Sequence, residues 1–162
     1  MADPVLRDAG PDDVAAVCAF GEAHVRRHYA PLIGTEAADA QVRHWWNADV
    51  IGAAVAAGLV VVAEDDGGVI GVGQRGRSGD EHVVYKLYVS PDHRGSGLGR
   101  RLLDALVAQL PPDADRLAIE HFAANERAGA FYEREGCRVE RVEPHPTGNH
   151  RLAVVWRARS LS

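Results

Sequence analysis

The sequence is poor in cysteine and in long apolar runs, and each shortage excludes a class of protein. Cys18 and Cys137 are the only cysteines among 162 residues, and their spacing fits neither a disulfide framework nor a zinc site. The longest apolar stretch, residues 50–63, is too short to span a bilayer. The opening "MADPVLRDAG" lacks the basic segment and apolar core of a signal peptide. We therefore expect a cytoplasmic protein with no metal ion and no membrane partner.

Basic residues are outnumbered by acidic ones, 18 to 23. The formal net charge is -5, whereas a general nucleic-acid binder needs a basic surface, so we expect no nucleic-acid partner. What the sequence does contain is 46% hydrophobic and 25% charged residues, with glycines scattered rather than repeated. This composition fits one globular domain covering residues 1–162.

Periodicity and turn residues predict the order of strands and helices. The "DDGG" between two apolar runs is typical of a hairpin, and Gly10 followed by Pro11 is typical of a helix start. Strands are expected at 5–9, 59–64, 69–74, 82–89, 117–122, 139–142 and 152–156, and helices at 11–25, 35–57, 98–110 and 126–135. This order predicts an α/β or α+β fold with a central mixed, mostly antiparallel sheet of about seven strands and about four helices.

A glycine-rich loop joins the fourth expected strand to the helix at 98–110. In "PDHRGSGLGRRLL" glycines occupy positions 95, 97 and 99, and arginines stand on both sides. Glycine allows positive φ and close approach to the main chain, so alternate glycines at a helix start form a cup of exposed N–H groups. The helix dipole and the arginines make this cup electropositive. The loop therefore predicts a site for phosphate or pyrophosphate.

Three known phosphate-binding patterns can be compared with this loop. A Walker loop needs Gly-Lys-Ser/Thr, but the only lysine of the chain is Lys86, which lies before the loop. A dinucleotide fingerprint needs G-x-G-x-x-G, and Arg100 stands where the third small residue belongs. The pattern Q/R-x-x-G-x-G/A fits at Arg94, Gly97 and Gly99.

Two motifs in this order resemble one family. Residues 87–106, "LYVSPDHRGSGLGRRLLDAL", resemble the coenzyme A motif of the GCN5-related N-acetyltransferases (the GNAT superfamily), and residues 125–137, "NERAGAFYEREGC", resemble its second motif. The resemblance implies a GNAT-like fold, a single N-acetyltransferase domain over residues 1–162 and acetyl-CoA as cofactor. It also implies transfer of the acetyl group to a primary amine of a small molecule or peptide by direct attack.

The resemblance also implies which residues hold coenzyme A. The main chain of Leu87, Tyr88 and Val89 would pair with the pantetheine arm, and Asn125 and Phe131 would lie along the thioester end beside Tyr132. The pyrophosphate would lie on the amides of the glycine loop, which are those of Arg94, Gly95, Ser96, Gly97, Leu98, Gly99 and Arg100.

The chemistry needs a proton donor for the leaving thiolate and an acceptor for the proton of the attacking ammonium, whose pKa is about 10 in water. Tyr132 matches the family's usual acid, although a tyrosine beside Phe131 is also an ordinary core residue. The family's usual base, a glutamate, is replaced by Val83. The alternatives are three: Glu81 acting through a water, Glu120, and His121, for which a satisfied interior or rim histidine is the more common interpretation.

The acceptor cannot be identified from one motif. In the family its site is walled by the segments that correspond here to residues 24–33, Trp45, Trp46, Gln74, Arg75 and the loop "EPHPTGNH". The arginines at 26, 27, 43 and 75 permit a carboxylate-bearing acceptor such as an amino acid or peptide. Two other functions stay open: a coenzyme A-binding sensor or regulatory domain with impaired catalysis, and an interaction domain without a cofactor. Relatives in the family often form dimers, so a homodimer is one option.

Overall fold

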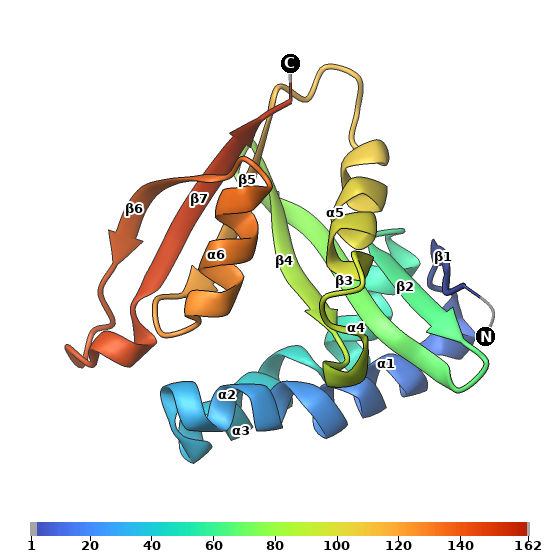
Figure 1. Cartoon of the computed structure of the whole chain (residues 1–162), viewed down its shortest axis with the longest axis horizontal. Coiled ribbons are helices and arrows are strands. Elements are labelled where there is room, and N and C mark those ends of the chain that lie inside the picture. The colour runs from blue at the N-terminus through green and yellow to red at the C-terminus, as the bar shows by residue number, and fades with distance from the viewer. Residues whose placement is uncertain (1–2, 162) are drawn as a thin grey trace.

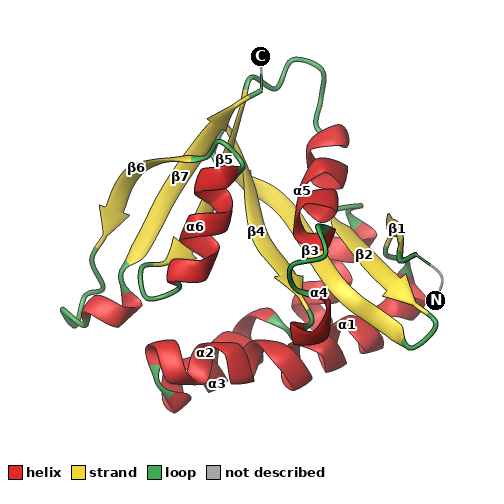
Figure 2. Ribbon diagram, in the orientation of Figure 1, coloured by secondary structure: helices red, strands yellow, loops and turns green. Residues whose placement is uncertain are grey.

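The computed structural model describes residues 3–161 (Figures 1 and 2), and its strands follow one another along the chain in the expected order. Seven strands form one sheet in the order β1-β2-β3-β4-β5-β7-β6, with every neighbouring pair antiparallel except β4 and β5. This confirms the predicted mixed, mostly antiparallel sheet. The strands are β1 (Val5–Asp8), β2 (Val60–Asp65), β3 (Gly68–Ser78), β4 (Glu81–Val89), β5 (Arg116–Phe122), β6 (Arg138–Glu143) and β7 (Val154–Ser160).

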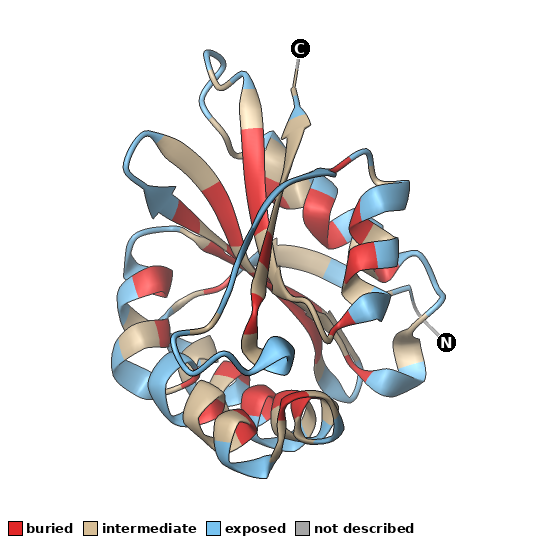
Figure 3. Ribbon diagram, turned by 90° about the vertical axis from the view of Figure 1, so that its left-hand side faces the viewer, coloured by how far each residue is buried: buried red, intermediate tan, exposed pale blue. Residues whose placement is uncertain are grey.

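Helices cover both faces of the sheet. The helices are α1 (Val14–Phe20), α2 (Arg26–Ile33), α3 (Thr35–Trp45), α4 (Ala48–Ala56), α5 (Leu98–Ala108) and α6 (Glu126–Arg134), and one π-helical turn joins α1 to α2 without a break. In β2, Val60 and Val62 face the core under α1–α4, whereas Val61 and Ala63 face the core under α5 and α6. Buried residues accordingly line both sides of the sheet (Figure 3). Two buried faces explain why this strand is a continuous apolar run rather than an alternating one.

The parallel pair β4–β5 is short, and it opens the middle of the sheet. Only Val83–Ala118 and Val84–Ile119 are paired, after which the two strands diverge (Figure 1). The register between β3 and β4 also shifts, because Gln74 lies opposite Lys86 and Arg75 opposite Val84. Tyr85 is therefore the extra residue of a β-bulge, which bends β4 and reverses its side-chain alternation.

Several expected element boundaries differ from the structure. The strand expected at 69–74 runs on to Ser78, and α2 lies where no helix was expected. The helix expected over 35–57 is broken after Trp45, because the Asn47 side chain caps α4 by accepting a 2.9 Å hydrogen bond from the Val50 N–H. The break turns Trp46 into the core, where it is 3% exposed. The last strand starts at Val154 rather than at residue 152, because the preceding loop ends in a short 3-10 turn, His150–Leu152.

Gly21 sets the position of Trp46, and this contact gives a first prediction. A Cβ at Gly21 would lie 2.7 Å from the Trp46 ring, closer than real contacts allow. Because the ring is buried, Gly21→Ala should lower the free energy of unfolding, measured by urea unfolding, by about 1–3 kcal/mol, the range of overpacking effects. Gly52→Ala in α4 is the matched control, because its Cβ would meet nothing within 4 Å. That variant should be unchanged or up to about 1 kcal/mol more stable. The same change in the free energy of unfolding for both variants would contradict a close contact between Gly21 and Trp46.

Candidate active site

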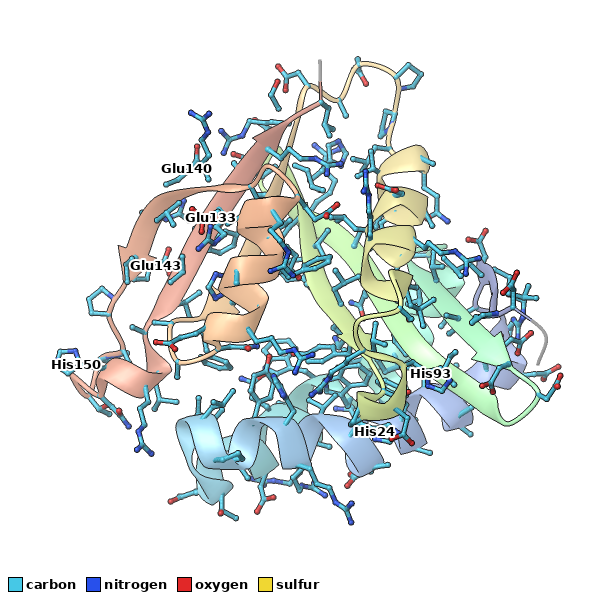
Figure 4. All side chains as sticks on the ribbon, in the orientation of Figure 1. His24, His93, Glu133, Glu140, Glu143 and His150 are labelled. Carbon is cyan, nitrogen blue, oxygen red and sulfur yellow. The ribbon has the colours of Figure 1, made fainter. Side chains whose placement is uncertain are left out.

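The glycine loop has the backbone of an anion-binding cup. Gly95 and Gly97 have φ of +80° and +82°, and Gly97 is the N-cap of α5 with no side-chain cap. Within the described residues, the N–H groups of residues 95–100 donate to no acceptor. Exposed donors at a helix N-terminus are suited to an anion. His93, labelled in Figure 4, stabilises the turn before the loop, because its Nδ1 is 2.7 Å from Ser90 Oγ.

A cavity of about 390 Å³ lies against this loop, between β4, the start of α5 and α6. Of the residues predicted to bind the cofactor, these line it: Leu87, Tyr88, Val89, Arg94, Gly95, Gly97, Gly99, Arg100, Asn125 and Phe131. Ser96 and Leu98 do not. The Leu98 side chain is 2% exposed in the core beneath α5, and the Ser96 hydroxyl donates to the His93 carbonyl at 2.5 Å. For these two residues only the backbone is available to a ligand.

Positive charge dominates the wall of this first cavity. Four arginines line it, which are Arg94, Arg100, Arg127 and Arg134. Among residues 3–161 the one acidic residue of this wall is Glu135, whose carboxylate is 3.6 Å from Arg100. Burial, together with the nearby Arg127, lowers the pKa of Arg94. Crowded guanidinium groups with so few carboxylates are stabilised by an anionic ligand such as a pyrophosphate.

A second cavity, of about 680 Å³, opens between α2, α3 and the diverging strands β4 and β5. It includes six positions from the segments expected to wall the acceptor site, which are Tyr29, Ile33, Trp45, Trp46, Gln74 and His145. The two cavities share five lining residues: Leu87, Tyr88, Asn125, Ala128 and Tyr132. A ligand in the first cavity and one in the second would therefore meet beside this shared wall.

Tyr132 stands in the shared wall and carries a protonated hydroxyl. It lies on α6 and is 6% exposed. The centroid of its ring is 5.3 Å from that of Phe131 and 6.0 Å from that of His121. Burial raises the pKa of Tyr132 far above its ordinary value. The Asn125 side chain begins the helix by accepting from the Ala128 N–H at 3.3 Å, and this cap fixes the start of the helix that carries Tyr132.

Glu81 does not reach either cavity. Its carboxylate is 2.8 Å from Arg116, whose guanidinium also binds Glu140 on β6 (Figure 4). The expectation that Glu81 shares a face with Tyr85 overlooked distance along the strand, because four residues of extended chain span about 13 Å. We therefore do not propose Glu81 as the base.

His121 lines the second cavity, but neither ring nitrogen is free. Nδ1 lies 2.9 Å from the Phe122 carbonyl, and Nε2 accepts from Arg157 Nε at 3.0 Å. Burial lowers the pKa of His121, so the neutral ring with the proton on Nδ1 is favoured. This arrangement matches the interior-histidine interpretation and leaves no lone pair for an ammonium proton.

Of the three candidate bases, Glu120 is the one that remains. It lies on β5 just beyond the two positions that pair with β4, and it is the only acidic residue lining the second cavity within residues 3–161. Burial, and then the charge of Glu143, raises the pKa of Glu120. A carboxylate with a raised pKa is a stronger proton acceptor than one in water.

The arginines proposed as carboxylate ligands do not line the second cavity. Arg26 is paired with Glu22 and Asp39, Arg75 donates to Gln109, and Arg27 and Arg43 are exposed. The cation that lines this cavity is Lys86 on β4, which was not among the residues predicted for this role. The sequence signal for this residue is a single lysine between the apolar and aromatic residues of 83–89.

Two further structural features bear on the expected partners. In the described part of the chain, no helix is both long enough and apolar enough to cross a membrane. Residues 3–161 also contain no group of three or more histidine, cysteine or acidic side chains arranged to hold a metal ion.

Comparison with known proteins gives similar sequences and folds. The chain is 34% identical to the L-amino acid N-acyltransferase MnaT of Escherichia coli over 108 residues, 63% of this chain and 60% of that protein. It is 39% identical to the mycothiol acetyltransferase of Propionibacterium freudenreichii over 92 residues, 51% of this chain and 28% of that protein. The chain therefore spans less than two thirds of these curated relatives.

A solved structure covers nearly the whole chain. The PaiA N-acetyltransferase of Thermoplasma acidophilum, crystallised with coenzyme A, superposes with a TM-score of 0.79 over 98% of this chain and 99% of its own, at 14% identity. This likeness confirms the predicted GNAT-like fold. The sequence model described as the acetyltransferase (GNAT) domain matches residues 56–138, which include both motifs and the strands between them. The chain belongs to the GNAT acetyltransferase family.

Proposed function

We propose that this protein is an acetyl-CoA-dependent N-acetyltransferase that moves an acetyl group to a primary amine of a small molecule or peptide by direct attack. The observation that carries the proposal is the shared wall, where the electropositive first cavity meets the second cavity at Tyr132. The names of the relatives, an N-acyltransferase and two acetyltransferases, support the same reaction class.

The first cavity fits coenzyme A. The unpaired N–H groups of residues 95–100 and the arginines around them suit its pyrophosphate, and Leu87–Val89 offer main-chain groups to its pantetheine arm. When bound, acetyl-CoA supplies the activated acetyl group as a thioester. Phe131 would lie along the arm, and Asn125 would lie near its end.

Tyr132 is the proposed general acid. Its raised pKa keeps the hydroxyl protonated throughout the neutral range, so the residue holds a proton ready for the leaving sulfur. Its position in both cavity walls suits a group that acts where the two ligands meet.

Glu120 is the proposed base, and this role gives a second prediction. Glu120→Gln should lower kcat/KM for an amine by roughly tenfold to a hundredfold, because the amide cannot accept the ammonium proton. In the wild type, kcat/KM should fall as pH decreases through the raised pKa of Glu120. Glu140→Gln is the matched control, since Glu140 is an exposed carboxylate that lines neither cavity and is bound to Arg116. Equal rates for wild type and Glu120→Gln would assign the base elsewhere.

The function itself is tested by mixing the protein with acetyl-CoA and a panel of primary amines. The proposal predicts amine-dependent release of free thiol and a product heavier by one acetyl group. Stabilisation by coenzyme A with no turnover on any amine would instead favour the sensor function, which the buried Val83 at the usual glutamate position motivates. A single domain, a cytoplasmic location and the homodimer stay predictions.

A further inference from the structure

Lys86 is a buried cation without an acidic partner. It is 6% exposed, and within the described residues no carboxylate lies within 4.0 Å of its ammonium. Its contacts are a 3.1 Å hydrogen bond to Gln74 Oε1 and the Trp46 ring, whose centroid is 5.4 Å from Nζ. Burial lowers the pKa of Lys86 to about 8, so the charged ammonium still predominates at pH 7. Such a charge is costly to bury unless an anion joins it.

A second donor lies beside this ammonium. Gln74 is 9% exposed, and its Oε1 is occupied by Lys86. Its Nε2 donates to no acceptor within residues 3–161. Both residues line the second cavity from adjacent positions on β3 and β4. An ammonium and a neighbouring amide N–H form a donor pair that matches the two oxygens of a carboxylate.

The opposite charge lies across the cavity on β5. The ionisable groups that line this cavity with Lys86 are Glu120, His121, His145 and the tyrosines at 29, 85, 88 and 132. Where β4 and β5 pair with each other, the last paired residues are Val84 and Ile119. Glu120 is the next residue of β5, and Lys86 lies two residues further along β4. The cavity therefore presents a cation on one strand and a carboxylate on the next, without an ion pair between them.

We propose that Lys86 and Gln74 bind the carboxylate of a free amino acid whose amino group faces Glu120, so the acceptor of this enzyme is an amino acid rather than a polyamine. This inference rests on the proposed function and deepens it. A polyamine would place a second cation against the buried ammonium, and like charges in a desolvated cavity repel strongly. An uncharged amine would leave the ammonium without a counter-ion.

The test compares L-amino acids with their carboxamides, which differ only in the carboxylate. Each of the common L-amino acids and its amide is supplied with acetyl-CoA, and kcat/KM is measured by thiol release. The wild type should prefer the better acids over their amides by roughly tenfold to a hundredfold, the range of a charged hydrogen bond. Lys86→Met keeps the unbranched shape of the side chain but removes its terminal charged atom, so this preference should fall to about one, mainly through a higher KM for the acids.

Controls separate this inference from the function on which it rests. Arg75→Met removes a cation from β3 outside the cavity and should keep the preference. Stabilisation by coenzyme A should be the same in Lys86→Met and wild type, which shows that the variant is folded. If Lys86→Met does not fold, calorimetric titration of wild type and coenzyme A with the acid and its amide gives the same comparison. Acetylation of amines with no preference for acids overturns this inference alone, whereas no turnover with any amine overturns the function as well.

Discussion

Replacing Gly97 with glutamate is expected to abolish the stabilisation of this protein by coenzyme A. Gly97 caps α5 at φ +82°, and a Cβ there would meet no heavy atom within 4 Å. A side chain would therefore extend into the open cup in front of the unpaired N–H groups. Its carboxylate would compete with the pyrophosphate for the same donors and for Arg94 and Arg100.

The size of the effect follows from mass action. At a coenzyme concentration of 100 times Kd, a folded protein gains about 2.7 kcal/mol, which raises Tm by about 5–10 °C for a chain of this length. The shift should disappear in Gly97→Glu. Gly79→Glu is the matched control, because Gly79 also has positive φ and open space but lies in the β3–β4 turn, outside both cavities. A full shift in Gly97→Glu would refute the placement of the pyrophosphate.

Tyr132→Phe is expected to lower kcat by about a hundredfold or more, the range typical of a lost general acid. The substitution removes only the hydroxyl, so the ring can keep its contacts with Phe131 and His121. Coenzyme A should therefore raise Tm of the variant as much as that of wild type. Because burial raises the pKa of Tyr132, loss of its proton should not limit the wild-type rate between pH 6 and 9.

The unfolding midpoint of Tyr132→Phe, measured beside its rate, separates a catalytic role of the hydroxyl from a structural one. If Tyr132 were only a core aromatic residue, Tyr132→Phe would keep its rate and its unfolding midpoint. A small loss of stability with an unchanged kcat would assign the hydroxyl a structural role and move the acid elsewhere in the shared wall.

Local signals made the glycine loop and its helix predictable. The αL conformation at Gly97 and the cap at Asn125 depend on residues a few positions away, so short motifs are enough to indicate them. The break after Trp45 had a comparable signal in Asn47, but the apolar pattern that continues past it favoured a single helix.

The second cavity could not be predicted in the same way. Lys86 and Glu120 belong to one cavity because β4 and β5 pair at two positions and then diverge, and that pairing joins residues far apart in the sequence. The bulge at Tyr85 also reverses the alternation of β4, so counting along the strand from Glu81 does not give the facing residues. Long-range pairing and a one-residue bulge leave no clear local pattern.

A crystal structure of the protein with coenzyme A would test the central claim most directly. The account predicts the pyrophosphate on the N–H groups of residues 95–100 and the sulfur within hydrogen-bond distance of the Tyr132 hydroxyl, at the wall that the two cavities share. Coenzyme A bound elsewhere, or bound in the first cavity with its sulfur directed away from Tyr132 and from the second cavity, would contradict it.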